Sequence, residues 1–193
     1  MHSRSDDPFA DALAAAVERI GAAVRAVAAS NPVVLIDGRS GAGKSSLATR
    51  LRRGWPLSGP VQVVALDSLY PGWEGLEAGA DAATERILLP HARGVIGIWR
   101  RWDWDREEEA EAHAVDPALA LIVEGCGALT ARAARLADVT VWVDGPAASR
   151  RQRALERDGD GLRAHWDMWA RQEEEHIARH DPVSLAHVRV QTP

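Results

Sequence analysis

The chain has 193 residues and a formal net charge of -5, so we expect one domain with its own hydrophobic core and no general affinity for nucleic-acid backbones. Its single cysteine, Cys126, excludes an intrachain disulfide and a zinc site built from several cysteines, and it fits a reducing cytoplasm. No apolar run is long enough to span a membrane, and residues 1–7 lack a signal-peptide core, so we expect a cytoplasmic protein without a membrane partner.

The first expected element is a helix within residues 1–30. Asp7 can cap this helix and Pro8 suits its first position. Apolar residues then recur at helical spacing, namely Phe9, Leu13, Val17, Ile20, Val24 and Val27. Because they form one apolar face, we expect this helix to pack against the domain rather than to do chemistry.

A glycine-rich loop follows the first expected strand. Val33–Asp37 is a β-branched apolar run, typical of a buried parallel strand, and Ser46–Arg52 predicts a helix. Between them, Gly38–Ser45 reads Gly-Arg-Ser-Gly-Ala-Gly-Lys-Ser, the pattern of a phosphate-binding loop. In such a loop, backbone N–H groups surround the phosphates, the lysine reaches the outer phosphates and the serine binds Mg²⁺. The predicted nucleotide-binding residues are Gly38, Arg39, Ser40, Gly41, Ala42, Gly43, Lys44, Ser45 and Ser46.

The middle of the chain predicts a second strand over Val61–Asp67 and a loop over residues 68–79. Asp81 can cap a helix that runs to about Leu89, where Pro90 closes it. Residues 95–106 are dense in Trp and Arg, and the acidic stretch 107–111 is typical of a solvated face.

The remaining expected elements alternate between strand and helix. They are a strand at Ala118–Glu124, a helix at Leu129–Leu136, a strand at Val139–Asp144, helices at about Ala147–Asp158 and Leu162–Arg179, and a strand at Val188–Val190. This alternation predicts a three-layer α/β/α sandwich with a mainly parallel sheet, as a single domain over 1–193. Together with the phosphate-binding loop, it indicates the P-loop NTPase architecture, for which we expect a small helical lid at about 146–162.

Acidic residues close three of the expected strands. Because ligands bind beyond the carboxyl ends of parallel strands, we expect Asp37, Asp67 and Glu124 to lie near Lys44. Asp67 can accept the proton of an attacking hydroxyl or hold a metal-bound water, although it could instead only cap its loop. Glu124 can help to hold Mg²⁺ together with Ser45, or it could merely end a strand at the surface.

Two clusters could complete a transfer site. Trp102-Asp103-Trp104, with Arg106 close by, combines stacking surfaces, a carboxylate that can accept a hydrogen bond from a hydroxyl, and a cation. Such a set could bind the phosphate acceptor. The alternative is a core segment with surface charges. Four arginines share the helix after the fourth strand, namely Arg150, Arg151, Arg153 and Arg157. They suggest a lid that neutralises triphosphate charge, unless Glu156 and Asp158 neutralise them.

The histidines give no convincing metal site. His176 and His180 lie one helical turn apart, but no third ligand is apparent in the sequence. We expect both to be surface residues at the end of their helix.

From Val33 onward, the chain resembles the uridine kinase and phosphoribulokinase branch of the phosphate-loop kinases. Besides the loop, Asp67-Ser68-Leu69-Tyr70 is similar to the family's Asp-Ser-Phe-Tyr, Trp102-Asp103-Trp104 to its Tyr-Asp-Tyr, and Ile122-Val123-Glu124-Gly125 to its Ile-Val-Glu-Gly. Arg150, Arg153 and Arg157-Asp158 resemble its lid arginines and Arg-Asp pair. The resemblance implies that Asp67 is the catalytic aspartate and that Asp103 positions the acceptor hydroxyl.

The acceptor side departs from that family. The His-Pro-Asp-Ala-Phe-Asp stretch that helps uridine kinases to recognise a nucleoside has no counterpart, and Tyr70-Pro71-Gly72-Trp73 lacks the family's arginine. The sequence therefore does not identify uridine as the acceptor. Trp73, Trp102 and Trp104 favour a ligand with a flat face.

The sequence thus predicts an ATP- and Mg²⁺-dependent kinase of a small metabolite. Its expected catalytic residues are Lys44, Asp67, Asp103, Arg150, Arg153 and Arg157, and its expected acceptor-binding residues are Tyr70, Trp73, Trp102, Asp103 and Arg106. The acceptor is a nucleoside or a similar ring-containing alcohol, with an antibiotic or a sugar as a rival. A nucleotide-dependent switch or partner-binding ATPase is the alternative from another class, although no Asn-Lys-x-Asp guanine-reading element is present. The oligomeric state, monomer or homodimer, is left open.

Overall fold

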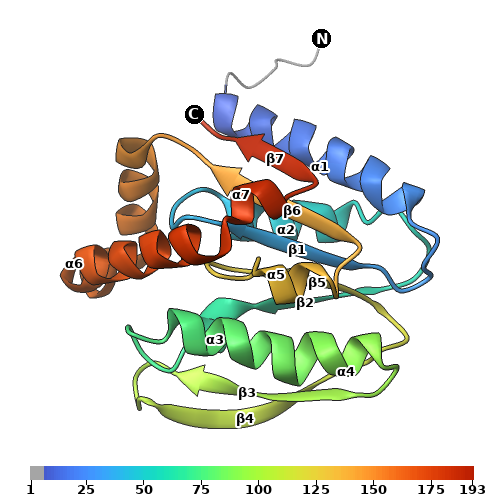
Figure 1. Ribbon diagram of the computed structural model, residues 1–193. Helices are drawn as coiled ribbons and strands as arrows, with labels where there is room; N and C mark the ends of the chain where they lie inside the picture. Colours follow the sequence, from blue (N-terminus) through green and yellow to red (C-terminus); the bar gives the residue numbers. More distant parts are fainter. Residues whose placement is uncertain (1–6) are drawn as a thin grey trace.

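The computed structural model describes residues 7–193 (Figure 1). Residues 1–6 lie outside the described residues. They make up most of residues 1–7, where the sequence shows no signal-peptide core. Among the helices that are described, none combines the length and apolar character needed to cross a membrane.

A five-stranded parallel sheet forms the centre of the structure (Figure 1). Its strands are β1 (Val33–Gly38), β2 (Val61–Ala65), β5 (Ala120–Glu124), β6 (Val139–Asp144) and β7 (Val188–Gln191), in the order β2-β5-β1-β6-β7. The register pairs Ala65 of β2 and Ile36 of β1 with Glu124 of β5, so these three strands end at the same edge. The predicted α/β fold with a parallel sheet is confirmed.

Alternating side chains of β1 divide the core into two halves, because successive strand residues face opposite sides of a sheet. Val34 and Ile36 pack with α1 (Pro8–Ala26) and α2 (Lys44–Arg53) on one side. Val33 and Leu35 pack on the other side. That second layer contains α3 (Leu76–Ala83), the π-helical segment η2 (Thr84–Leu88), α4 (Leu89–Ala92) and α5 (Ala131–Ala134).

The helix expected from Asp81 to Leu89 is longer than predicted, because α3, η2 and α4 form one helical run from Leu76 to Ala92. Asp81 is an exposed residue inside that run and not its cap, so that expectation was wrong. Pro90 does not close the helix either. The wider π turn, in which the Leu89 N–H donates to the Thr84 carbonyl, accommodates a residue that has no N–H to donate.

The Trp- and Arg-rich segment and the acidic stretch after it form a separate antiparallel hairpin, β3 (Gly97–Asp103) and β4 (Glu108–Val115). Neither strand was expected. The acidic side chains of β4 are exposed, as predicted for a solvated face, and Glu111 pairs with Arg101 across the hairpin. Figure 1 shows the hairpin against the run from α3 to α4, at the periphery of the domain.

The two helices expected after β6 form the two arms of α6 (Ala147–His180), which Figure 1 shows at a marked angle. The bend lies at Gly159, whose φ of 65° and ψ of -142° belong to a region that is essentially restricted to glycine. One-turn helix α7 (Pro182–Leu185) follows. Helix α5 is also a single turn and therefore shorter than the expected Leu129–Leu136.

We expect Gly159→Ala to lower the free energy of unfolding by about 1–3 kcal/mol, because alanine has to adopt a glycine-only conformation. Gly161→Ala is the matched control, since Gly161 is helical and a Cβ there would meet no atom. It should stabilise the protein by up to about 1 kcal/mol. Urea unfolding of both variants provides the measurement. Equal stabilities for the two would show that the bend does not depend on Gly159.

Candidate active site

The phosphate-binding loop lies between β1 and the first residue of α2, in a left-handed backbone conformation at two glycines. Gly41 has a φ of 74° and Gly43 a φ of 105°. A Cβ on Gly41 would lie 1.9 Å from the carbonyl oxygen of Arg150, so only glycine fits where the loop meets α6. The loop backbone is thereby brought to the N-terminus of α2, where N–H groups and the helix dipole favour an anion.

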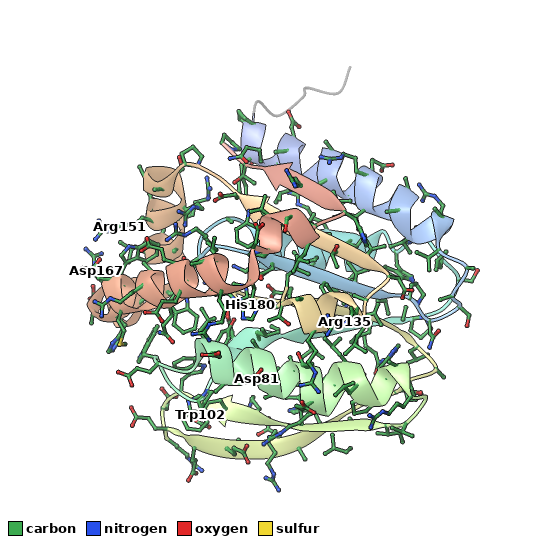
Figure 2. The ribbon with its side chains drawn as sticks, in the orientation of Figure 1. Asp81, Trp102, Arg135, Arg151, Asp167 and His180 are labelled. Atoms are coloured by element: carbon green, nitrogen blue, oxygen red, sulfur yellow. The ribbon has the colours of Figure 1, made fainter. Side chains whose placement is uncertain are left out.

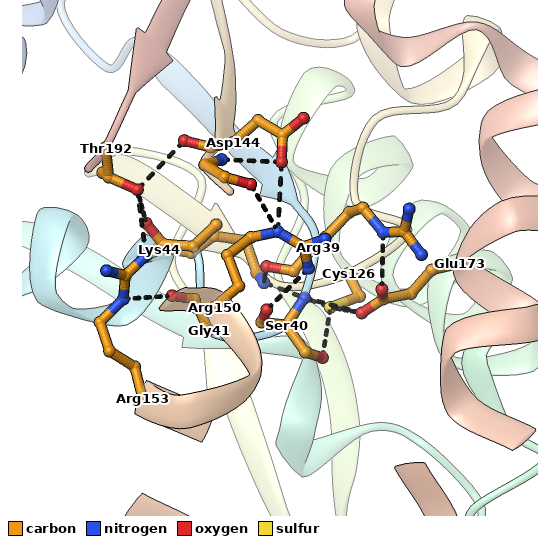
Figure 3. Close-up of polar contacts among 12 residues, drawn as sticks. Arg39, Ser40, Gly41, Lys44, Cys126, Asp144, Arg150, Arg153, Glu173 and Thr192 are labelled. Carbon is orange, nitrogen blue, oxygen red and sulfur yellow. Dashed lines mark hydrogen bonds and ion pairs between the residues drawn. The ribbon is translucent and has the colours of Figure 1, made fainter. Parts of the chain in front are cut away.

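Lys44 is buried at the inner side of the loop. Its Nζ donates to the carbonyl oxygen of Arg39 and to Sγ of Cys126, both at 3.2 Å (Figure 3). Burial lowers the pKa of Lys44, yet its interactions with Cys126, Glu124 and Glu173 raise it more, so the net shift is upward. The ammonium group therefore stays charged, as a phosphate-binding lysine requires.

One cavity of about 320 Å³ brings together the acidic and basic groups that the sequence placed at this sheet edge. Asp67 lies in the 3-10 turn η1 (Leu66–Ser68) directly after β2, and Glu124 is the last residue of β5. Both line the cavity together with Lys44, Ser45 and Arg157. Asp37 does not, because its carboxylate is buried behind the loop.

Ser45 and Glu124 offer the oxygen ligands that Mg²⁺ prefers. Burial raises the pKa of Glu124, and the charge of Asp67 raises it further, while Lys44, a hydrogen bond from Ser45 and Arg157 lower it. Within residues 7–193, no group of three or more His, Cys, Asp or Glu side chains is arranged to hold a metal. The donor set therefore fits Mg²⁺ bound mainly through triphosphate oxygens, with one or two protein ligands.

Aromatic side chains line the rest of the cavity: Tyr70, Trp73, Trp104 and Trp169. The Tyr70 hydroxyl donates to the Cys126 carbonyl at 2.7 Å, and the Trp104 indole N–H donates to the Asp67 carbonyl at 2.9 Å. Trp169 was not expected here; it comes from the second arm of α6. Three of the residues expected to bind the acceptor, Tyr70, Trp73 and Trp104, thus line this cavity.

The other residues of the Trp-Asp-Trp segment lie outside this cavity. The Asp103 carboxylate accepts the N–H groups of Asp105 and Arg106 and pairs with Arg101, so it holds the hairpin turn. The backbone hydrogen bond from Arg106 is the main reason why the pKa of Asp103 is lowered. Trp102 (labelled in Figure 2) does not line the cavity, and the Arg106 guanidinium pairs with Glu108.

The arginines of the first arm of α6 are divided between the loop and the cavity. Arg150 donates to the carbonyl of Ser40 at 3.1 Å, and Arg153 donates to the carbonyl of Gly41 at 2.9 Å (Figure 3). Arg157 lines the cavity, where both of its hydrogen bonds go to Asp158 at 2.6 Å, the pairing that the sequence offered as an alternative.

Not all the predicted nucleotide-binding residues face the cavity. Ser40, Gly41, Gly43, Lys44 and Ser45 line it. The remaining four, Gly38, Arg39, Ala42 and Ser46, do not.

A buried carboxylate that sequence reasoning missed supports the loop from behind. Glu173, in the second arm of α6, accepts the N–H of Ser40 at 2.7 Å, the Nε–H of Arg39 at 3.1 Å and the Sγ–H of Cys126 at 3.3 Å (Figure 3). Burial raises the pKa of Cys126 to about 12, so this group is a neutral thiol. The only sequence signal for Glu173 was its place on an apolar-faced helix.

A second buried pair corrects the expectation for the histidines. His176 is only 8% exposed, and its Nε2 lies 3.0 Å from Oδ2 of Asp37. The Asp37 carboxylate also accepts the N–H groups of Gly38, Gly127 and Leu129. His176 is therefore a core residue and not a surface residue, since it pairs with a carboxylate that is itself buried away from water.

A second groove of about 600 Å³ lies between α3, α5 and the second arm of α6. Asp81, Arg135 and His180, labelled in Figure 2, are among its lining residues. None of the predicted catalytic residues lines this groove, whereas three of them, Lys44, Asp67 and Arg157, line the smaller cavity.

The comparisons with known proteins show the fold. No family model and no curated protein sequence matches the chain. A solved structure described as a possible uridine kinase from Bacillus stearothermophilus has a TM-score of 0.67 and 18% identity, over 92% of this chain and 98% of that one. A provisional fructose transport system kinase from Silicibacter sp. TM1040 has a TM-score of 0.55 and 21% identity, over 94% and 98%. The chain thus has the fold of the phosphate-loop kinases that it resembled in sequence.

We expect Asp37→Asn to lower the free energy of unfolding by about 3 kcal/mol, because an amide cannot accept all four hydrogen bonds and leaves buried donors unpaired. Asp81→Asn is the control, since this side chain is exposed. It should change stability by less than about 0.5 kcal/mol. Thermal unfolding of both variants tests this, and a small effect at Asp37 would contradict its assigned role.

Proposed function

We propose that the protein is an ATP- and Mg²⁺-dependent kinase that phosphorylates a hydroxyl group of a small, ring-containing molecule. The observation that carries this proposal is that one cavity combines a phosphate-binding half with an aromatic half. Lys44, Ser45 and Glu124 belong to the first half, and Trp73 and Trp104 to the second. Asp67 lines the same cavity, and its backbone carbonyl accepts the indole N–H of Trp104. An acceptor on the aromatic rings would therefore meet a carboxylate.

On the donor side, the loop N–H groups and Lys44 bind the β- and γ-phosphates. Ser45 and Glu124 would hold Mg²⁺, which supplies positive charge to the transferring phosphate when bound. Arg150 and Arg153 position the loop through its carbonyls, which leaves Arg157 as the lid arginine for the developing charge. Arg157 can serve in this way only after its pairing with Asp158 loosens, so we infer that the first arm of α6 moves when ATP binds.

On the acceptor side, Asp67 accepts the proton of the attacking hydroxyl. Asp103 is more remote than the sequence suggested, and we assign it the positioning of the hairpin that carries Trp104. The names of the two similar structures mention different small molecules, since one refers to a uridine kinase and the other to a fructose transport system kinase. They therefore support a small-molecule kinase without selecting its substrate.

We expect Asp67→Asn to keep the affinity for ATP within about threefold while it lowers the rate of phosphate transfer by at least about a hundredfold, since only the proton acceptor is lost. Isothermal titration with a non-hydrolysable ATP analogue and a coupled ADP assay provide the two readouts. Asp105→Asn, outside the cavity, is the control and should behave like the wild type. An unchanged rate in Asp67→Asn would instead favour a nucleotide-dependent switch or partner-binding ATPase.

Because burial raises the pKa of Glu124, this carboxyl group takes up a proton at a higher pH than an ordinary glutamate. We expect the Mg²⁺-dependent gain in ATP affinity to be complete above the raised pKa and to decrease as the pH falls through it. Mg²⁺ titrations between about pH 5 and pH 8 measure this gain. Glu124→Gln should show only a small Mg²⁺-dependent gain in ATP affinity, and this gain should not decrease through the pKa of Glu124. The same pH profile in both proteins would exclude Glu124 as the titrating group.

A further inference from the structure

We propose that the phosphate acceptor is a cationic ring alcohol: a compact molecule with a flat, positively charged ring and a hydroxyl side chain. This inference rests on the proposed kinase function and names the acceptor class of that same site. It depends on the aromatic half of the cavity, on the hydrogen bonds already made there and on the balance of charge.

The aromatic half consists of four side chains, which we call the aromatic wall (Tyr70, Trp73, Trp104 and Trp169). Tyr70 and Trp169 are nearly fully buried, and one face of Trp73 stacks on the ring of His165. The ring centroids of Trp73 and Trp104 are 5.0 Å apart, those of Tyr70 and Trp169 are 4.9 Å apart, and those of Trp73 and Trp169 are 6.4 Å apart. Indole and phenol rings carry partial negative charge on their faces and attract cations, most strongly where water is excluded.

Two of the four polar groups of the wall are occupied by backbone carbonyls. The Tyr70 hydroxyl and the Trp104 indole N–H donate to carbonyls of Cys126 and Asp67, and burial raises the pKa of Tyr70, which keeps its hydroxyl neutral. Nearby, Gln172 donates to the Trp73 carbonyl and accepts the N–H of Leu76. A sugar with many hydroxyls would lose its hydrogen bonds to water here and regain few, whereas a flat ring needs few.

The charges of the cavity also favour a cation. The lining includes three carboxylates, Asp67, Glu124 and Asp158, and two cations, Lys44 and Arg157. Lys44 is fixed at the loop, and Arg157 is paired with Asp158. Among the described residues, no cation of the protein forms an ion pair with Asp67, which faces the acceptor. Its negative charge therefore attracts a positively charged ring and repels a phosphorylated sugar.

The size of the cavity sets the last constraint. A volume of about 320 Å³ is at the lower end of the range for small-molecule sites, and the terminal phosphates occupy part of it. One ring with a short hydroxyalkyl group fits this space better than a two-ring compound.

The test compares two probes of nearly the same shape, N-(2-hydroxyethyl)pyridinium and 2-phenylethanol, with protein saturated by Mg²⁺ and a non-hydrolysable ATP analogue. Quenching of tryptophan fluorescence reports binding at the aromatic wall. We expect the pyridinium alcohol to bind about tenfold more tightly than the neutral alcohol. Equal or weaker binding of the cation would overturn the inference.

Two substitutions at one position link the preference to the aromatic wall. Trp104→Phe and Trp104→Leu both lose the indole N–H, but only the first keeps an aromatic face. Trp104→Phe should keep most of the preference for the cation, and Trp104→Leu should lose it, with unchanged affinity for the ATP analogue in both. The same preference in both variants would overturn the role of the wall.

Failure of this inference and failure of the kinase function have different signatures. Phosphorylation of 2-phenylethanol, or of another neutral alcohol, in preference to the pyridinium alcohol would overturn the acceptor class and leave the kinase function intact. If the protein binds the ATP analogue but phosphorylates no alcohol when ATP and Mg²⁺ are supplied, both the acceptor class and the kinase function are overturned.

Discussion

The structure depends on the way in which α6 satisfies the backbone of the phosphate-binding loop. A loop that approaches phosphates has to turn sharply, and its own peptide groups then lack partners from regular secondary structure. Glu173 accepts the Ser40 N–H from one arm of α6, while Arg150 and Arg153 donate to the Ser40 and Gly41 carbonyls from the other arm. Both arms thus hold the loop in place before any nucleotide arrives.

The same helix connects the two halves of the cavity. Its first arm carries Arg157, next to the phosphate side, and its second arm carries Trp169, in the aromatic wall. Gly159 lies between them at the bend. A movement of the first arm about this residue would change the position of Arg157 without disturbing the Asp37–His176 pair, which belongs to the second arm and the sheet.

Features that follow from local pattern or from sheet topology could be predicted from the sequence. The loop motif follows from the spacing of its glycines, lysine and serine. The parallel sheet and the meeting of Asp67 with Glu124 follow from apolar strands that end in acids, because parallel strands share one carboxyl edge. Contacts between distant segments could not be predicted. Glu173 lies 133 residues from Ser40, and His176 lies 139 residues from Asp37, so no local spacing indicates either contact.

The errors have equally specific causes. Charged residues on both faces of β3 and β4 hide the alternation by which a half-buried strand is recognised, so the hairpin was missed. Proline usually marks the end of a helix, but a π turn before Pro90 lets the helix continue.

The proposed kinase function requires that one cavity transfers the terminal phosphate of ATP to an alcohol. Phosphorus NMR of a reaction that contains ATP, Mg²⁺ and a mixture of ring-containing alcohols tests it most directly. We expect a new phosphate monoester signal that grows in step with ADP, without an equal amount of inorganic phosphate. The appearance of inorganic phosphate alone, or of no product with any alcohol, would contradict it.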